Sequence, residues 1–381
     1  MSSTATPASL SCPQCGAKGL EFAPDAQKLQ CTYCGWQGEV ETVQAEITEH
    51  AYRELRNWSA QPQVTLAAQE IQCPSCGAVT TFDPTRVADR CAFCGTHLNV
   101  QPKSASPVVA PQAVIPFAVA RQPMFQRLLQ WLGKNWFAPN DLKKLAEPES
   151  IQGIYLPFWT FDSQTRTFYR GERGEYYYTT ERYQDSEGNW QTREVRHTRW
   201  YRTSGWVERF FDDVLVAATQ SVPVQRLERL LELGYSASAL KPYDDRYLAG
   251  YQVERYQVTP VQAWERAKEK MDRVIESDIC SDIGRDEQRI LEKRTSYDAI
   301  TFKHILLPVW LFSYRYRGRT YQVMGCGITG RIFGDRPISV WKVLLAILGA
   351  LLALGIGIWA VQMAESQNQP PPPRQEQPSP Y

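Results

Sequence analysis

The sequence lacks the signatures of several large protein classes. It contains no GxxxxGK[ST] phosphate-binding loop, so we expect no helicase or other nucleotide-driven motor activity. The first ten residues have no apolar core, so we expect no secretory signal and no oxidising compartment. The net charge is only +1, so overall charge gives no reason to expect a polyanionic partner.

A catalytic constellation is also missing. His304 has no evident Ser or Cys nucleophile with a carboxylate nearby, and we interpret it as a hydrogen-bonded strand histidine. The neighbouring acids Asp212 and Asp213 would point to opposite faces of a strand, which argues against one shared site. Cys280 and Cys326 are isolated in the sequence and predicted to be buried. We therefore predict that the protein is not an enzyme.

What the sequence does contain is eight of its ten cysteines in two copies of one pattern. Each copy has two CxxCG units, separated by 15 residues in the first copy and 14 in the second. Four thiolates from two such knuckles can close a tetrahedron around Zn²⁺ and leave no open position for a substrate. The sequence therefore predicts two structural zinc sites, one from Cys12, Cys15, Cys31 and Cys34, the other from Cys73, Cys76, Cys91 and Cys94.

Two other interpretations of the cysteines stay open. The pairs could form disulfides, although the absence of a secretory signal argues against this. Iron could replace zinc, as in rubredoxin, but rubredoxin knuckles lie further apart in sequence than these do. The segment 1–110 has seven Lys or Arg against ten Asp or Glu, and each closed four-thiolate zinc site adds a charge of about −2. Such acidic ribbons argue against binding to a phosphate backbone.

A charge-free run of 19 residues, 343–361, lies near the C-terminus. As a helix it spans roughly 28 Å, about the thickness of a hydrocarbon core. Trp341 and Trp359 are close to its ends, where interfacial aromatics are common. The sequence predicts a single transmembrane helix in contact with membrane lipid; the alternatives are a buried helix of a soluble protein and a cleaved lipid-anchor signal.

The charges around this run predict its orientation. Arg331, Arg336 and Lys342 precede it, whereas the tail after it carries Arg374 against Glu365 and Glu376. By the positive-inside rule, and because thiolate sites favour a reducing compartment, we expect the N-terminal bulk in the cytoplasm. Gly349, Ala353 and Gly357 form a small-residue stripe compatible with a homo-oligomer, although such residues are also common in membrane helices without one.

The chain divides into segments of different composition. We predict an α+β fold with two zinc ribbons at 11–40 and 71–100, a Pro- and Ser-rich linker at 101–112, a body at 113–339, a transmembrane helix at 341–361 and a Pro-rich tail at 362–381. Between the ribbons, residues 46–58 have the periodicity of a short helix. The ribbons are offset by 60 to 61 residues, which indicates a duplication.

The body also contains a repeat. Residues 154–161 (IYLPFWTF) are similar to residues 305–312 (ILLPVWLF), at an offset of 151. A helix-like stretch precedes each copy, at 124–136 and 261–279, and strands follow, so we predict two related halves with a mainly antiparallel sheet. Proline cannot donate to a sheet ladder, so we expect Pro157 and Pro308 on an edge strand or at a strand start.

A hairpin is predicted within the first half. Residues 185–189 (DSEGN) separate two strand-like runs. Arginines and aromatic residues alternate in the second run and could form a nucleic-acid platform. However, residues 161–210 have nearly balanced charge, which favours a solvated sheet face instead. The residues concerned are Arg193, Arg196, Arg199 and Arg202 with Trp190, Trp200 and Tyr201.

With these motifs assembled, the chain resembles a family of bacterial membrane-anchored double-zinc-ribbon proteins. Members are often labelled primosomal replication protein N′, helicase-related, or transcription-factor-IIB-type zinc ribbon proteins. The resemblance covers nearly the whole chain up to the apolar run, and it implies a scaffold at the membrane with no assigned chemistry. It is carried by the four CxxCG knuckles, Ile115–Phe117, Gly153–Asp162, Phe211–Val214, Lys303–Trp310, Thr329–Gly330 and Gly334–Pro337.

These features lead to one main hypothesis. We expect a membrane-anchored zinc-ribbon scaffold or adaptor that recruits protein partners at the cytoplasmic face of the membrane. The alternative is a nucleic-acid-binding protein of replication or transcription that uses the ribbons. An enzyme or electron carrier would need iron in the knuckles or a catalytic set that the sequence does not show.

Overall fold

The computed structural model describes residues 11–17, 19–40, 46–53, 69–73, 78–82, 91, 93, 103–104, 111–134, 136–139, 142, 151–232, 234–317 and 319–367. The chain forms two compact units. The first comprises residues 1–127 and 147–335, and the second comprises residues 128–146 and 336–381. Each unit contains both sheet or loop segments and helix, and the first holds most of the strands. The fold is mixed α+β, dominated by sheet, as the composition predicts.

The first ribbon is a small antiparallel sheet in the first unit. Its strands are β1 (Leu20–Ala23), β2 (Lys28–Cys31) and β3 (Gln37–Glu39), in that order. Phe22 is buried and packs edge-on against Tyr247, with ring centroids 5.4 Å apart. The Phe22 amide donates to the carbonyl of Ala249 at 2.9 Å. This hairpin is therefore attached to the body by one aromatic anchor and a backbone bond.

Two long antiparallel strands form the centre of the main sheet. They are β9 (Ile151–Gln184) and β13 (Glu287–Tyr316), paired from Ile151 with Phe312 to Gly174 with Glu287. Twelve strands belong to this sheet. The others are β4 (His50–Ala51), β5 (Gln69–Gln72), β6 (Val79–Phe82), β7 (Lys103–Ser104), β8 (Ala113–Val114), β10 (Trp190–Ala217), β11 (Lys241–Pro242), β12 (Gln252–Glu254), β14 (Arg319–Cys326) and β15 (Ile332–Gly334).

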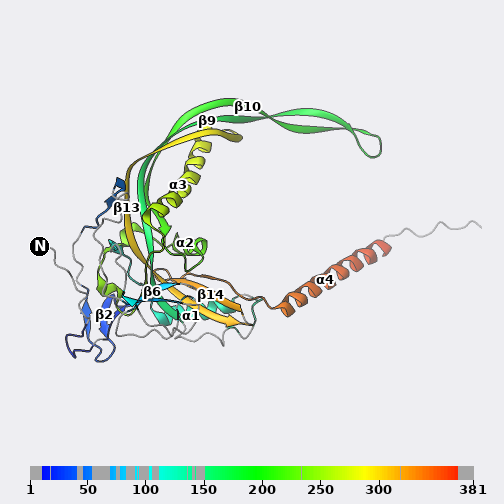
Figure 1. Ribbon diagram of the computed structural model, residues 1–381. Coiled ribbons are helices and arrows are strands. Elements are labelled where there is room, and N and C mark those ends of the chain that lie inside the picture. Colours follow the sequence, from blue (N-terminus) through cyan, green and yellow to red (C-terminus); the bar gives the residue numbers. More distant parts are fainter. Residues whose placement is uncertain are drawn as a thin grey trace, which may run out of the picture. The chain divides into compact units, whose positions relative to one another are not determined.

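The predicted hairpin is confirmed. β10 pairs with β9 over nearly its full length, and the chain reverses between Asp185 and Asn189, whose backbone groups hydrogen-bond at 3.0 Å. The hairpin continues past the last residue that β13 contacts, Gly174, so its outer part is a two-stranded ribbon. Figure 1 shows this ribbon extending well beyond the end of β13.

The expectation for the two prolines is wrong. Pro157 and Pro308 lie inside the two central strands, opposite Leu306 and Tyr155. The carbonyl of Pro157 accepts from the Ala218 amide and so points away from β13; the carbonyl of Pro308 likewise accepts from Gly327. The nitrogen of a strand residue points to the same side as its oxygen. Each proline nitrogen therefore faces the place where one neighbouring strand ends and the next begins, and no ladder bond is lost.

Three helices accompany the strands, close to the predicted positions. α1 spans Arg121–Gly133, α2 spans Val224–Glu232 and α3 spans Pro260–Ile283. Thr259 caps α3, and its side chain exchanges hydrogen bonds with Gln262 in a capping box. One face of α3 buries residues at helical spacing, from Ala263 to Ile283, against the curved inner side of β9, β10 and β13 (Figure 1).

Residues 46–51 do not form the expected helix. Glu46 to Glu49 are irregular, and β4 pairs with Thr301 and Phe302 of β13. The free energy of pairing with a long exposed strand edge outweighs a weak local helix preference here. The rest of that predicted helix, residues 54–58, lies outside the described residues.

The hairpin of the second ribbon belongs to the main sheet. β5 and β6 pair with each other, and β6 pairs antiparallel with β12, which in turn pairs parallel with β9. Val253 lies opposite Thr81, and Glu254 lies opposite Thr80. The sheet is therefore continuous from this ribbon into the body.

The second unit contains one long helix, α4 (Val340–Gln367). Its segment Val340–Ala360 is long and apolar enough to cross a membrane, and none of it is buried within the described chain. Lys342 donates from Nζ to the carbonyl of Ala138 at 2.8 Å, within the same unit. The predicted transmembrane run thus coincides with one candidate membrane-spanning helix.

Candidate metal centre

Four sulfurs of the first ribbon converge, as the sequence predicts. Cys12, Cys15, Cys31 and Cys34 form a group whose potential ligand atoms all lie within 4.8 Å of one another. The Sγ atoms of Cys12 and Cys34 are 3.5 Å apart, and those of Cys15 and Cys31 are 3.7 Å apart. Cys31 is the last residue of β2, so the sheet fixes one knuckle relative to the other.

The two knuckles have the same backbone geometry. The amide of Gly16 donates to the Cys12 carbonyl at 2.8 Å, and the amide of Gly35 donates to the Cys31 carbonyl at 3.0 Å. Both glycines have positive φ, +71° and +76°. A side chain would strain the backbone at this point, which explains why glycine follows each CxxC pair.

The sulfur spacing matches a tetrahedral zinc–thiolate site. With Zn–S bonds of about 2.3 Å, the edge of an ideal tetrahedron of sulfurs is about 3.8 Å. The observed separations of 3.5 and 3.7 Å agree with that edge. A disulfide would require about 2.05 Å, so these four cysteines are not joined to one another. The donor set is complete, and a bound ion would have no position left for a substrate.

The electrostatics of the four thiols also favour a cation. Hydrogen bonds from the amides of Cys34 and Tyr33 lower the pKa of Cys31 to about 7. For Cys34 the Trp36 amide lowers the pKa, but burial and the neighbouring sulfurs outweigh it and raise the pKa to about 12. Four sulfurs this close cannot all carry a negative charge without a positive ion between them. Zn²⁺ would supply that charge and hold all four as thiolates.

The second ribbon is described in part. Cys73 and Cys91 are buried, at 2% and 4% exposure, in one apolar cluster with Ala78 and Phe93. The amide of Cys73 donates to the Ala78 carbonyl at 2.9 Å, which repeats the Cys12–Ala17 bond of the first ribbon. Cys76 and Cys94 lie outside the described residues, so the second metal site remains a prediction.

The surroundings of the second ribbon differ from those of the first. The Phe93 carbonyl accepts from Ser313 Oγ at 2.8 Å and from Gln322 Nε2 at 2.9 Å. Cys73 and Cys91 belong to the same core cluster as Leu307 and Leu311 of β13. By contrast, Cys15 and Cys34 are exposed, and Tyr33 between the first ribbon's ligands is 76% exposed.

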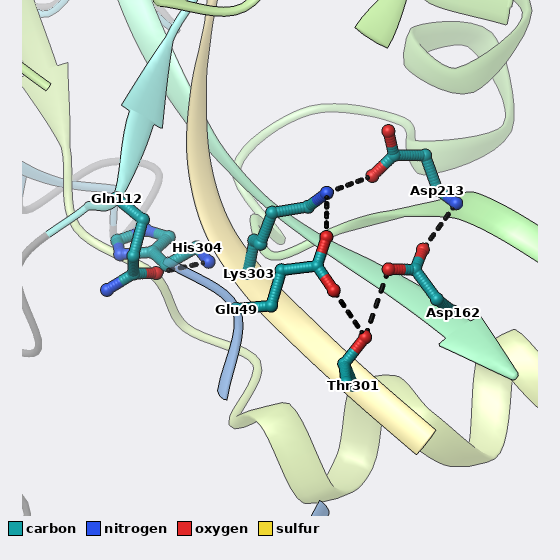
Figure 2. A network of polar contacts seen from close by, with 7 residues as sticks. All are labelled: Glu49, Gln112, Asp162, Asp213, Thr301, Lys303 and His304. Carbon is teal, nitrogen blue, oxygen red and sulfur yellow. Dashed lines mark hydrogen bonds and ion pairs between the residues drawn. The ribbon is translucent and has the colours of Figure 1, made fainter. Parts of the chain in front are cut away.

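A buried ionic network lies on the body, and sequence reasoning missed it. Lys303 Nζ contacts a carboxylate oxygen of Glu49 and one of Asp213, both at 2.8 Å (Figure 2). Thr301 Oγ1 donates to or shares a proton with Glu49 and Asp162 at 2.7 and 3.0 Å. Its only signal in the sequence is a charged Lys303 next to the apolar run that follows it in β13.

Burial sets the protonation of this network. The pKa of Asp162 rises to about 6, first because of burial and then because Glu49 lies close by. For Lys303, burial would lower the pKa, but hydrogen bonds to Asp213 and Glu49 outweigh it and raise that pKa. Among the described residues only the four cysteines of the first ribbon form a group able to hold a metal, so we assign this network a structural role. It joins the segment between the ribbons to β13.

The other candidate residues behave as the bland interpretations predicted. His304 is buried, its amide donates to Gln112 Oε1 at 2.7 Å, and its ring packs on Trp159. Asp213 joins the network whereas Asp212 is exposed, so the two acids share no site. Cys326 is buried and accepts a hydrogen bond from the Thr329 amide.

A further buried carboxyl lies where the second ribbon meets the body. Glu254 of β12 is 1% exposed, and its Oε1 accepts from Gln257 Nε2 at 2.9 Å and from the hydroxyl of Ser221. Its Oε2 has no hydrogen-bond partner in the described part of the chain. Burial raises the pKa of Glu254 to about 7.

One curated relative is similar over nearly its full length. The chain is 29% identical over 338 residues to the uncharacterized protein YdjG of Bacillus subtilis (strain 168), which covers 88% of this chain and 92% of YdjG. No family model matches the chain. No solved structure matches it significantly. The similarity brings no assigned activity with it.

Proposed function

We propose that the protein is a membrane-anchored zinc-ribbon scaffold that recruits protein partners at the cytoplasmic face of the membrane. The observation that carries the proposal is the first ribbon's closed four-sulfur group, whose knuckles are exposed while its hairpin is anchored through Phe22. A site with four protein ligands stabilises a fold and offers a bound ion no room for substrate. An exposed, rigid surface built around it suits binding rather than catalysis.

The anchor is α4, oriented with its N-terminal side in the cytoplasm. Its apolar segment Val340–Ala360 and the basic residues that precede it support this orientation. The same compartment keeps thiolates reduced and able to hold Zn²⁺.

We further propose two structural zinc ions with different tasks. The second ribbon's Cys73 and Cys91 lie in the body's core, which supports a structural task for the ion they would hold. The first ribbon contributes few residues to that core, which leaves its knuckle face for a partner. Tyr33 is the most exposed large side chain on that face and the residue we expect a partner to contact.

The body is proposed to be a duplicated unit that joins the ribbons to the anchor. Three observations support two related halves. Leu156 and Leu307, equivalent in the repeat, lie directly opposite each other in β9 and β13. Trp159 donates from Nε1 to the Val258 carbonyl at 2.8 Å, and its equivalent Trp310 donates to Val119 at 2.9 Å. Parallel pairs flank both central strands, β12 with β9 and β8 with β13.

The scaffold proposal is tested by capturing bound proteins from gently solubilised membranes. The full chain, Tyr33→Ala and a matched control at another exposed tyrosine, Tyr178→Ala, are compared at equal metal content. We expect Tyr33→Ala to lose the captured partners while the control and the zinc content stay unchanged. Retention of every partner after deletion of the whole first ribbon would contradict the proposal.

A further inference from the structure

The outer edge of β10 has no strand partner. Among the described residues β10 pairs only with β9, and from Trp190 to Phe211 no other backbone hydrogen bond to this strand occurs. This is a free edge more than 20 residues long in a single strand. Exposed edges of such length are templates for the addition of another strand.

The hairpin turn determines which residues face that edge. Asp185 and Asn189 are hydrogen-bonded across the turn, and the ladder continues without a register shift as far as Phe211. In an antiparallel pair, bonded and non-bonded positions alternate. Odd-numbered residues from 191 to 209 therefore bond to β9, and even-numbered residues from 190 to 210 direct their amides and carbonyls outward.

A second copy pairing with this edge about a twofold axis must match even residues with even residues. The axis then passes beside one residue that faces itself, and each residue pairs with its mirror position. With the axis at Thr198, Glu194 faces the partner's Arg202, Arg196 faces the partner's Trp200, and Val195 faces the partner's Tyr201. Trp190 faces the partner's Trp206, and no two like charges between Trp190 and Trp206 are opposed.

Neighbouring registers are less favourable. An axis at Arg199 places Arg196 against the partner's Arg202, and an axis at Arg196 places Arg193 against the partner's Arg199. An axis at His197 pairs no opposite charges. Like charges directly opposite in a sheet are destabilising, and opposite charges are stabilising.

Two residues on this edge support the Thr198 register directly. Glu194 and Arg202 are the opposite charges that it brings together twice per dimer. Neither has an ion pair or hydrogen-bonding side-chain partner among the described residues, whereas Arg193 pairs with Glu181 and Arg209 with Asp278. Both thus present an uncompensated charge along the open edge.

We propose that two copies of this chain associate by antiparallel pairing of their β10 edges about a twofold axis at Thr198. The pairing extends the sheet across both copies, over roughly 55 Å for the 17 residues from Trp190 to Trp206. A homodimer of this kind gives the scaffold two first-ribbon faces on one continuous sheet.

Disulfide trapping of the full chain in membranes tests this register. Residues opposite each other at the axis have Cα atoms about 5.5 Å apart, within the range that a disulfide spans. We expect Thr198→Cys to give a dimer that is resistant to denaturant and sensitive to reductant after mild oxidation. Thr192→Cys serves as the matched control, because its two copies would lie roughly 40 Å apart. Combining Thr192→Cys with Ser204→Cys should restore the dimer, since these two residues face each other.

Charge reversal supplies a second, independent arm. In the Thr198→Cys background, Glu194→Arg or Arg202→Glu alone should lower the yield of trapped dimer about tenfold, because each creates like charges twice. The two reversals together should restore it. The proposal is overturned if Thr198→Cys stays monomeric, if it traps no better than Thr192→Cys or the wild-type chain, or if the double reversal fails to rescue.

Discussion

The two ribbons share one cysteine pattern but are embedded differently. In the first, two cysteines and Tyr33 are exposed, and attachment to the body depends on Phe22 and a few backbone bonds. In the second, Cys73 and Cys91 are part of the body's core, and the hairpin extends the main sheet through β12. The same motif can thus stabilise an independent surface or complete a core, and its neighbours decide which.

The largest expected effect is a difference between the two metal sites. Cys73→Ser should destabilise the body, because a structural zinc ion contributes about 10 kcal/mol or more to a ribbon and this ribbon shares the body's core. Cys12→Ser should unfold the first ribbon and change the body's stability by only about 1 kcal/mol. Urea unfolding of the full chain in detergent, followed by tryptophan fluorescence, measures both. Equal loss of body stability in the two variants would remove the distinction between the ribbons.

The next effect concerns the segment that connects the ribbons. Lys303→Met leaves Glu49 and Asp213 buried without their cation, so we expect a loss of about 3–5 kcal/mol in unfolding free energy. Lys293→Met is the control, since its partners Asp272 and Glu276 are largely exposed and such pairs contribute about 1 kcal/mol or less. Similar costs for the two variants would show that the buried network does not hold this segment.

A smaller effect depends on pH at the junction of the second ribbon and the body. The pKa of Glu254 rises from 4.5 to about 7 in the folded chain because the carboxyl is buried. A raised pKa favours the folded state below pH 4.5, and this advantage is lost as pH rises through 7. Between these values the chain should lose up to about 3 kcal/mol of stability.

Glu254→Gln tests this pH dependence, because the amide cannot ionise. The difference in unfolding free energy between wild type and variant should change with pH from 5.5 to 8 in the direction that favours the variant at high pH. Taking the difference cancels the pH dependence of the metal sites themselves. A difference that stays constant over this range would show that Glu254 ionises normally in the folded chain.

Much of the local structure could be predicted from the sequence. The cysteine spacing predicted the convergence of Cys12, Cys15, Cys31 and Cys34, because ligand geometry is encoded within a few residues of each knuckle. The DSEGN loop predicted the β9–β10 turn, and helical periodicity predicted α3. These features depend on short-range chemistry that each segment carries by itself.

Long-range pairing could not be predicted in the same way. Pro157 looked like an edge residue because its missing amide matters only when a neighbour needs it, and that depends on where β10 ends and β12 begins. Residues 46–51 looked helical until β13 offered a strand edge. The Lys303 network joins residues more than 250 positions apart, so no local pattern could indicate it.

Zinc release during thiol modification tests the central distinction most directly. The folded full chain in detergent is treated with a mercurial reagent, and the released zinc is followed with a chromogenic chelator. The account predicts two zinc ions per chain, one released quickly from the first ribbon and one released only when the body unfolds, with the fast phase absent in Cys12→Ser. A chain that holds no zinc, or that releases all its zinc in one fast phase, would contradict it.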